Sequence, residues 1–149
     1  MANDSLNAAE WVQYAQEDYN LAVMIVKTHS PYPVPIRIVC YQCQQSVEKI
    51  LKAYMIAKEG ERTKTHDLEK LLEQCIYHSS DFSGFDTACA TLSTYVAASR
   101  YPSNMNLTES RMKEAMKDAF QILEFVKSKL RELGVNFKNI DFDIKDLNL

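Results

Sequence analysis

A scarcity of turn-forming residues constrains the fold of this chain more than any other feature. Its 149 residues include only three glycines and four prolines, and three of the prolines fall between residues 31 and 35. Such a sequence has little turn chemistry for an all-β fold and favours long helices joined by few connections. At this length we expect one domain that buries most of its apolar surface.

Apolar residues recur at three- and four-residue steps in five segments, which is the spacing of amphipathic helices. The pattern predicts helices over 8–28, 35–59, 65–78, 85–100 and 108–134. The first two are separated by the breaker Ser30-Pro-Tyr-Pro-Val-Pro. The sequence therefore predicts an all-α, up-and-down bundle of four to five helices over residues 1–134, with a short C-terminal tail.

Individual residues mark several of these helix boundaries. Gly60 and Gly134 stand where a left-handed residue commonly ends a helix. Thr65 and Thr108 are predicted to cap the third and the last helix with their hydroxyls. The short segment 79–84 is predicted to be a loop.

Residues 135–149 change character, because apolar side chains are set there among Asn, Asp and Lys. The apolar members are Phe137, Ile140, Phe142, Ile144 and Leu147. These side chains would be costly to expose together. We expect the tail to pack on the bundle or to lie at an oligomer interface, and both alternatives stay open.

Composition limits the classes of partner and cofactor. A net charge of −3 and a pI near 5.6 exclude a global basic surface for nucleic acid, although a local basic site is compatible with them. No signal peptide is visible, and no apolar run approaches the roughly 18 residues of a membrane span. A cytoplasmic protein without membrane contact is expected. The four cysteines and three histidines lack zinc-ligand spacing, so no metal and no cofactor are predicted.

One face of the second predicted helix carries amides and ammonium groups beside the apolar stripe. They are spaced by three, four and three residues: Gln42, Gln45, Lys49 and Lys52. Ammonium donors suit phosphate, and amides both donate and accept, so this face could bind a nucleotide. Alternatively it is a solvated face on which Glu48 pairs with Lys52 at i, i+4. The spacing does not decide between these interpretations.

Asp18 lies on the apolar stripe of the first predicted helix, where an unpaired carboxylate would be costly. Its natural partner is Arg100, at the helix end forced by the following Tyr101-Pro102. The pair would either fix how two helices meet or orient Arg100 toward a ligand. Arg100 can bind phosphate at two points. Tyr101 could stack on a base, although a core or interface position is favoured.

His66 stands beside the predicted cap of the third helix. A functional role would be a hydrogen bond to a nucleotide, or acid–base work if the imidazole approached Arg100. The sequence alone favours an ordinary capping or loop residue.

Three motifs of this sequence are the run Gln42–Tyr54, Thr65-His66-Asp67-Leu68 and Ser99-Arg100-Tyr101-Pro102. In their order along the chain and in their separations, they resemble the motifs of the HEPN family. The resemblance begins near Trp11, Ala15 and Asp18 and covers most of the chain. HEPN proteins are small helical domains found beside nucleotidyltransferases and in nucleotide- and RNA-handling systems. The resemblance implies a nucleotide-binding site formed by Arg100, Tyr101, His66, Gln45, Lys49 and Lys52, supported by Asp18 and Gln42.

Many members of that family carry a ribonuclease signature in which an arginine is followed a few residues later by a histidine. After Arg100 this sequence reads Tyr-Pro-Ser-Asn-Met-Asn, so the histidine is missing. The resemblance therefore favours a non-catalytic nucleotide-binding or regulatory module, and no catalytic residue is assigned. It implies a homodimer, or a separate nucleotidyltransferase partner as in toxin–antitoxin systems, with a nucleotide or RNA as ligand. The alternatives are a metal-independent ribonuclease with a degenerate motif and a purely structural interaction protein.

Overall fold

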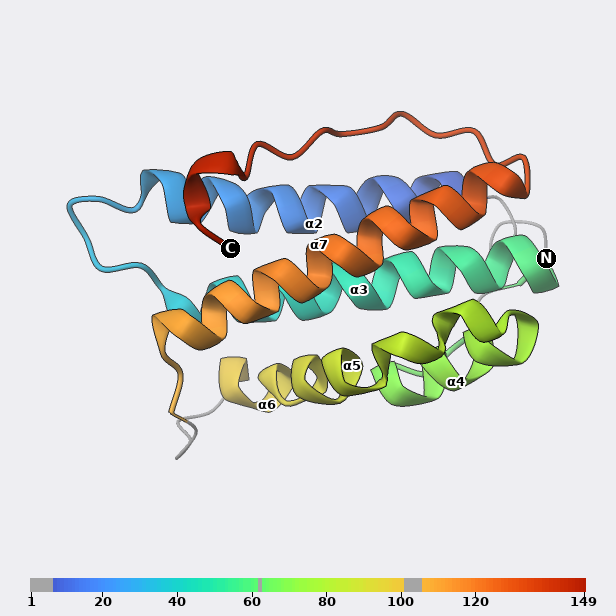
Figure 1. The fold of residues 1–149 in the computed structure, drawn as a ribbon, viewed down its shortest axis with the longest axis horizontal. Helices are drawn as coiled ribbons and strands as arrows, with labels where there is room; N and C mark the ends of the chain where they lie inside the picture. Colours follow the sequence, from blue (N-terminus) through green and yellow to red (C-terminus); the bar gives the residue numbers. More distant parts are fainter. Residues whose placement is uncertain (1–6, 62, 101–105) are drawn as a thin grey trace.

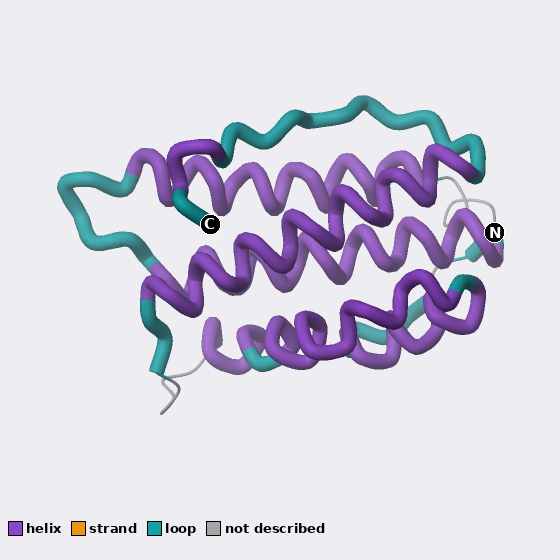
Figure 2. The backbone as a smooth tube through the Cα atoms, viewed as in Figure 1, coloured by secondary structure: helices purple, strands orange, loops and turns teal. Residues whose placement is uncertain are grey.

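The computed structural model describes residues 7–61, 63–100 and 106–149, except for the side chains of Ser99 and Arg100. Throughout these residues the regular structure is helical and contains no strand, as Figure 2 shows, which confirms the predicted all-α bundle. The elements are α2 (Ala8–Thr28), α3 (Ile36–Glu59), α4 (Leu68–His78), η1 (Ser80–Phe85), α5 (Asp86–Ser93), α6 (Tyr95–Arg100), α7 (Glu109–Glu132) and η2 (Lys145–Leu147).

Helix α3 is the central element of the bundle. It contacts α2, α7, α4, α5 and α6. In Figure 1 the long helices α2, α3 and α7 run alongside one another, while the short helices α4, α5 and α6 form a row on the other side of α3. Since α3 is covered on several sides, its buried residues include polar ones as well as apolar ones.

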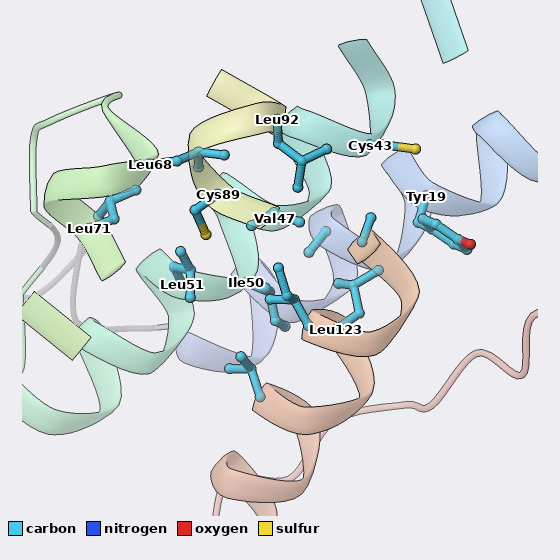
Figure 3. Close-up of a cluster of buried hydrophobic side chains, with 14 of the residues drawn as sticks. Tyr19, Cys43, Val47, Ile50, Leu51, Leu68, Leu71, Cys89, Leu92 and Leu123 are labelled. Atoms are coloured by element: carbon cyan, nitrogen blue, oxygen red, sulfur yellow. The ribbon is translucent and has the colours of Figure 1, made fainter. Parts of the chain in front are cut away.

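The core lies where side chains from five helices meet around α3. Figure 3 shows Ile50 of α3 near Leu123 of α7. Leu71 of α4 and Leu92 of α5 lie on the side of Ile50 that faces away from Leu123. Each fully buried leucine or isoleucine contributes roughly 1.5–3 kcal/mol relative to an exposed one. The hydroxyl of Tyr19 is also buried and donates a 2.8 Å hydrogen bond to the Met116 carbonyl. This bond links α2 to α7 and satisfies the one polar atom of that side chain.

Three of the predicted helix boundaries are confirmed. Gly60 and Gly134 adopt the left-handed conformation, with φ of 79° and 84°. Thr108 caps α7, since its hydroxyl accepts a 3.1 Å hydrogen bond from the Arg111 amide.

The predicted cap of the third helix is wrong. Asp67 caps α4 instead, and its carboxylate accepts hydrogen bonds from the amides of Glu69 and Lys70 at 2.9 Å and 3.4 Å. The Thr65 hydroxyl accepts from the Asp67 amide at 3.2 Å, which stabilises the turn before the helix. An ionised carboxylate is the stronger acceptor, so the cap lies two residues later than the sequence suggested.

Two further local predictions are corrected. The segment predicted as a loop forms the 3₁₀ helix η1, capped by Ser79, whose hydroxyl accepts from the Asp81 amide at 3.4 Å. The single helix predicted up to Arg100 is divided at Thr94 into α5 and α6. The Thr94 hydroxyl donates to the Thr91 carbonyl at 2.7 Å, an alternative to helix hydrogen bonding that threonine side chains favour.

The tail returns along α2 after Gly134, as the red segment of Figure 1 shows. Phe142 packs against Tyr19 with ring centroids 4.7 Å apart. Lys27 forms ion pairs with Asp143 and Asp146 at 2.8 Å and 3.3 Å. These contacts place the tail against the bundle within one chain. The domain boundary at residue 134 stays a prediction. A role of the tail at an oligomer interface also stays a prediction.

All four cysteines are buried and free. Burial raises the pKa of Cys40 to about 11 and that of Cys89 to about 12, and it also raises the pKa of Cys43 and of Cys75 well above the ordinary value of a thiol. No group of residues in the described ranges could hold a metal ion. None of the described helices has the length and apolarity needed to cross a membrane.

We therefore expect the thiols of the folded protein to resist alkylation, because the thiolate is the reactive form. At pH 8, iodoacetamide should label the native protein far more slowly than the protein unfolded in guanidinium, with mass spectrometry counting the labels. Rapid labelling of any one cysteine in the folded state would contradict this expectation.

Candidate functional site

A cavity of about 300 Å³ lies where α2, α3, α6 and the segment before α4 meet. It contains four residues of the predicted nucleotide site, three from α3 and one from the segment before α4. Its lining is Trp11, Tyr41, Gln45, Glu48, Lys49, Lys52, His66 and Val96. This volume is at the lower end of the roughly 300–1,000 Å³ found for small-molecule sites.

Helix α3 supplies most of the lining because of its periodicity. Gln45, Lys49 and Lys52 are spaced by four and three residues, so their side chains emerge on one face. Glu48 lies on the same face, three residues after Gln45 and four before Lys52. Gln42 is half-buried one turn nearer the start of α3 and does not line the cavity. The predicted polar face is therefore only partly brought into the site.

Asp18 of α2 pairs with Lys49. The Lys49 Nζ atom lies 2.6 Å from Asp18 Oδ2, and the two side chains are about one-quarter exposed. The Asp18 carboxylate therefore has a cationic partner, as its predicted position on the apolar face of the first helix required. The expected partner, Arg100, has a side chain outside the described residues, so its contact with Asp18 stays a prediction.

Glu48 is the buried centre of a second charged group. One of its oxygens, Oε2, lies 2.9 Å from Lys52 Nζ and 2.8 Å from His66 Nδ1. The side chains of Glu48 and Lys52 are only 7% and 1% exposed, whereas that of His66 is 80% exposed. The pair Glu48–Lys52 exists as the sequence suggested, but it lies beneath the surface and not on a solvated face.

The cation of Lys52 has a further neighbour in Trp11, whose ring centroid lies 5.7 Å from Nζ. A cation within about 6 Å of an indole face is attracted by the ring quadrupole. Lys52 is thus held by a carboxylate and an aromatic ring from two helices. It is a fixed charge in the wall of the cavity.

Two glutamines continue the polar network along α3. Gln45 Nε2 donates to Gln44 Oε1 at 2.6 Å, and Gln44 Nε2 donates weakly to Glu48 Oε1 at 3.4 Å. Gln45 also lines the cavity.

Of the other two predicted site residues, Arg100 is the last residue of α6 and Tyr101 follows it in the sequence. Val96 lines the cavity, and Arg100 follows it by one helical turn. The Arg100 side chain and the whole of Tyr101 lie outside the described residues, so both assignments stay predictions.

Sequence reasoning missed four residues of the lining, namely Trp11, Tyr41, Glu48 and Val96. Trp11 and Tyr41 were not assigned to the site, because periodicity marks a helix face without showing what it packs against. Glu48 was considered only as a surface partner of Lys52. The signal that could have placed Glu48 in the site is its position three residues after Gln45 and four before Lys52, which puts it on the same helix face.

Among the described residues, the carboxylates and ammonium groups around this cavity balance one another. Asp18 and Glu48 offset Lys49 and Lys52, so an incoming anion must compete with Asp18 for the more accessible ammonium of Lys49. The aromatic rings of Trp11 and Tyr41 offer apolar surface beside these charges. The arrangement can hold a small ligand with one flat apolar part and one anionic part.

Comparisons with known proteins agree with this architecture. The HEPN domain model matches residues 8–129. The crystal structure of an archaeal HEPN homologue is similar to this chain, with a TM-score of 0.64 and 21% identity over 83% of this chain and 97% of that one. At that identity the likeness shows the fold alone. No curated protein matches the sequence significantly. Because the family match extends from α2 through most of α7, the chain belongs to the HEPN domain family.

Proposed function

We propose that this HEPN domain is a non-catalytic nucleotide-binding or regulatory module. One observation carries the proposal: Gln45, Lys49, Lys52 and His66, which are separated by up to 21 positions in the sequence, line one cavity together with two aromatic rings. In this proposal the base lies against Trp11 and Tyr41, and a phosphate approaches Lys49. Arg100 and Tyr101 complete the site from the end of α6.

The non-catalytic role is supported by the sequence after Arg100, which lacks the histidine of the ribonuclease signature. In the proposal the domain works as a homodimer or with a separate nucleotidyltransferase, as in toxin–antitoxin systems. Support for these partners comes from the family resemblance.

A thermal-shift screen against nucleoside mono-, di- and triphosphates tests the proposal. A ligand at about 100 times its Kd should stabilise the protein by about 2.7 kcal/mol, or roughly 5–11 °C at this chain length. Arg100→Ala should abolish the shift. If no nucleotide shifts the unfolding temperature, the domain is better explained as a structural interaction protein.

Two variants of the ion pair between α2 and α3 should change affinity in opposite directions. Lys49→Ala removes the accessible cation and should weaken nucleotide binding about tenfold or more. Asp18→Asn releases that cation from its carboxylate and should strengthen binding. Lys117→Ala, at an exposed position of α7, is the matched control and should leave the affinity unchanged. Isothermal titration calorimetry measures all three, and equal affinities for Lys49→Ala and Asp18→Asn would contradict the phosphate position.

A further inference from the structure

The imidazole of His66 is held so that one nitrogen faces inward and the other outward. Its Nδ1 atom lies 2.8 Å from the buried Glu48 carboxylate and 3.5 Å from the Lys52 ammonium. The ring as a whole is 80% exposed, and among the described residues the inner nitrogen meets one hydrogen-bond acceptor, Glu48.

These contacts select one tautomer of the neutral ring. A carboxylate only accepts hydrogen bonds, and an ammonium only donates them. At 2.8 Å from the carboxylate, Nδ1 must therefore carry the proton. The outward Nε2 atom then has a lone pair and no hydrogen. A buried carboxylate that fixes a histidine tautomer through Nδ1 is also the device by which catalytic triads orient their imidazole.

A second cavity, of about 330 Å³, adjoins His66. Its lining is Gln44, His66, Asp67, Glu69, Ser93 and Val96, so the two cavities share His66 and Val96. The carboxylates of Asp67 and Glu69 are acceptors, and the Ser93 hydroxyl is buried without a hydrogen-bond partner in the described structure. This second cavity thus suits a part of a ligand that donates hydrogen bonds.

We infer that His66 Nε2 accepts a hydrogen bond from a ribose hydroxyl, and that the site therefore prefers ribonucleotides to deoxyribonucleotides. The inference rests on the proposed nucleotide-binding function. With the base against the aromatic rings and the phosphate at Lys49, the sugar is the remaining part of the ligand that donates hydrogen bonds. Its vicinal hydroxyls meet the acceptors at His66 and in the second cavity. Glu48 is a positioning residue, because it acts on the ligand through the ring of His66.

The tautomer is tested without any ligand. Long-range ¹H–¹⁵N correlation spectra of the full chain at about pH 9, where imidazole is neutral, distinguish the two tautomers of each histidine. The expected result is the Nδ1–H form for His66. The Nε2–H form would overturn the inference, whatever the protein binds.

The ligand preference is tested with matched nucleoside 5′-monophosphates that carry ribose, 2′-deoxyribose or 3′-deoxyribose. Removal of one of the two hydroxyls should weaken binding to the native protein about tenfold. His66→Phe should lose the preference for that hydroxyl, whereas the control His29→Phe should keep it. Binding without any ribose preference would overturn this inference alone. Absence of binding by every nucleotide would overturn the proposed function and the inference with it.

Discussion

Replacing Glu48 with alanine is expected to destabilise the domain by about 3–5 kcal/mol, since the substitution leaves a buried cation without its partner. Lys52 is 1% exposed, and its ammonium lies 2.9 Å from the Glu48 carboxylate. Without that carboxylate the ammonium must stay buried and unpaired or rearrange toward water. Denaturant unfolding followed by circular dichroism measures the change.

Two controls separate this effect from simple loss of packing. The double variant Glu48→Leu with Lys52→Met removes both charges and should recover most of the stability, because an apolar pair replaces a buried ion pair with little or no net cost. Asp18→Ala breaks the more exposed pair with Lys49 and should cost only about 1 kcal/mol or less. If Glu48→Ala were as stable as Asp18→Ala, the buried position of the Glu48–Lys52 pair would be wrong.

Gln16→Leu is expected to release the C-terminal tail and to cost about 2–4 kcal/mol. The Gln16 side chain is fully buried and makes three hydrogen bonds, two to the tail and one to Lys127 of α7. Its Oε1 accepts from the Ile140 amide at 2.8 Å and from Lys127 Nζ at 3.1 Å, and its Nε2 donates to the Lys138 carbonyl at 2.9 Å. Leucine has a similar size but leaves these groups unpaired, and an unsatisfied buried group costs about 1–3 kcal/mol.

Lys127 makes the loss of Gln16 more costly. The Lys127 side chain has no exposed surface, and its ammonium is held by Glu124 at 2.8 Å and by Asn139 at 2.8 Å as well as by Gln16. Removal of Gln16 therefore weakens the coordination of a buried charge at the point where α2, α7 and the tail meet.

Amide hydrogen exchange at Ile140 measures release of the tail directly, and denaturant unfolding measures the loss of stability. Gln13→Leu is the matched control, because Gln13 lies on the same helix but is exposed and donates a 3.0 Å hydrogen bond to Glu17 of that helix. Its stability should change by no more than about 0.5 kcal/mol. Equal exchange rates in the two variants would show that Gln16 does not hold the tail.

The helices were largely predictable because their signals are local. The period of apolar residues identified α2, α3 and α7, and a glycine with positive φ ended α3 as expected. The errors were local too. At the start of α4, Asp67 and Thr65 are both suitable caps, and only the observed hydrogen bonds show which of them caps the helix. The helix break at Thr94 could not be predicted, because no proline or glycine marks it in the sequence.

The candidate site was predictable only in part. The spacing of Gln45, Lys49 and Lys52 placed them on one face, and the structure brings them into one cavity. The spacing also included Gln42, which the cavity does not reach. Arg100 and Tyr101 stay predictions from the family motif.

The sequence by itself determined an all-helical chain and the polar face of α3, because both follow from the backbone period of a single helix. Only the tertiary structure decided what covers that face. It buries Glu48 with Lys52 beneath Trp11, brings His66 onto their shared carboxylate and fastens the tail to Gln16 and Lys127. Those contacts join residues that are distant in the chain, and a helical period specifies which side chains share a face but not which element packs against it.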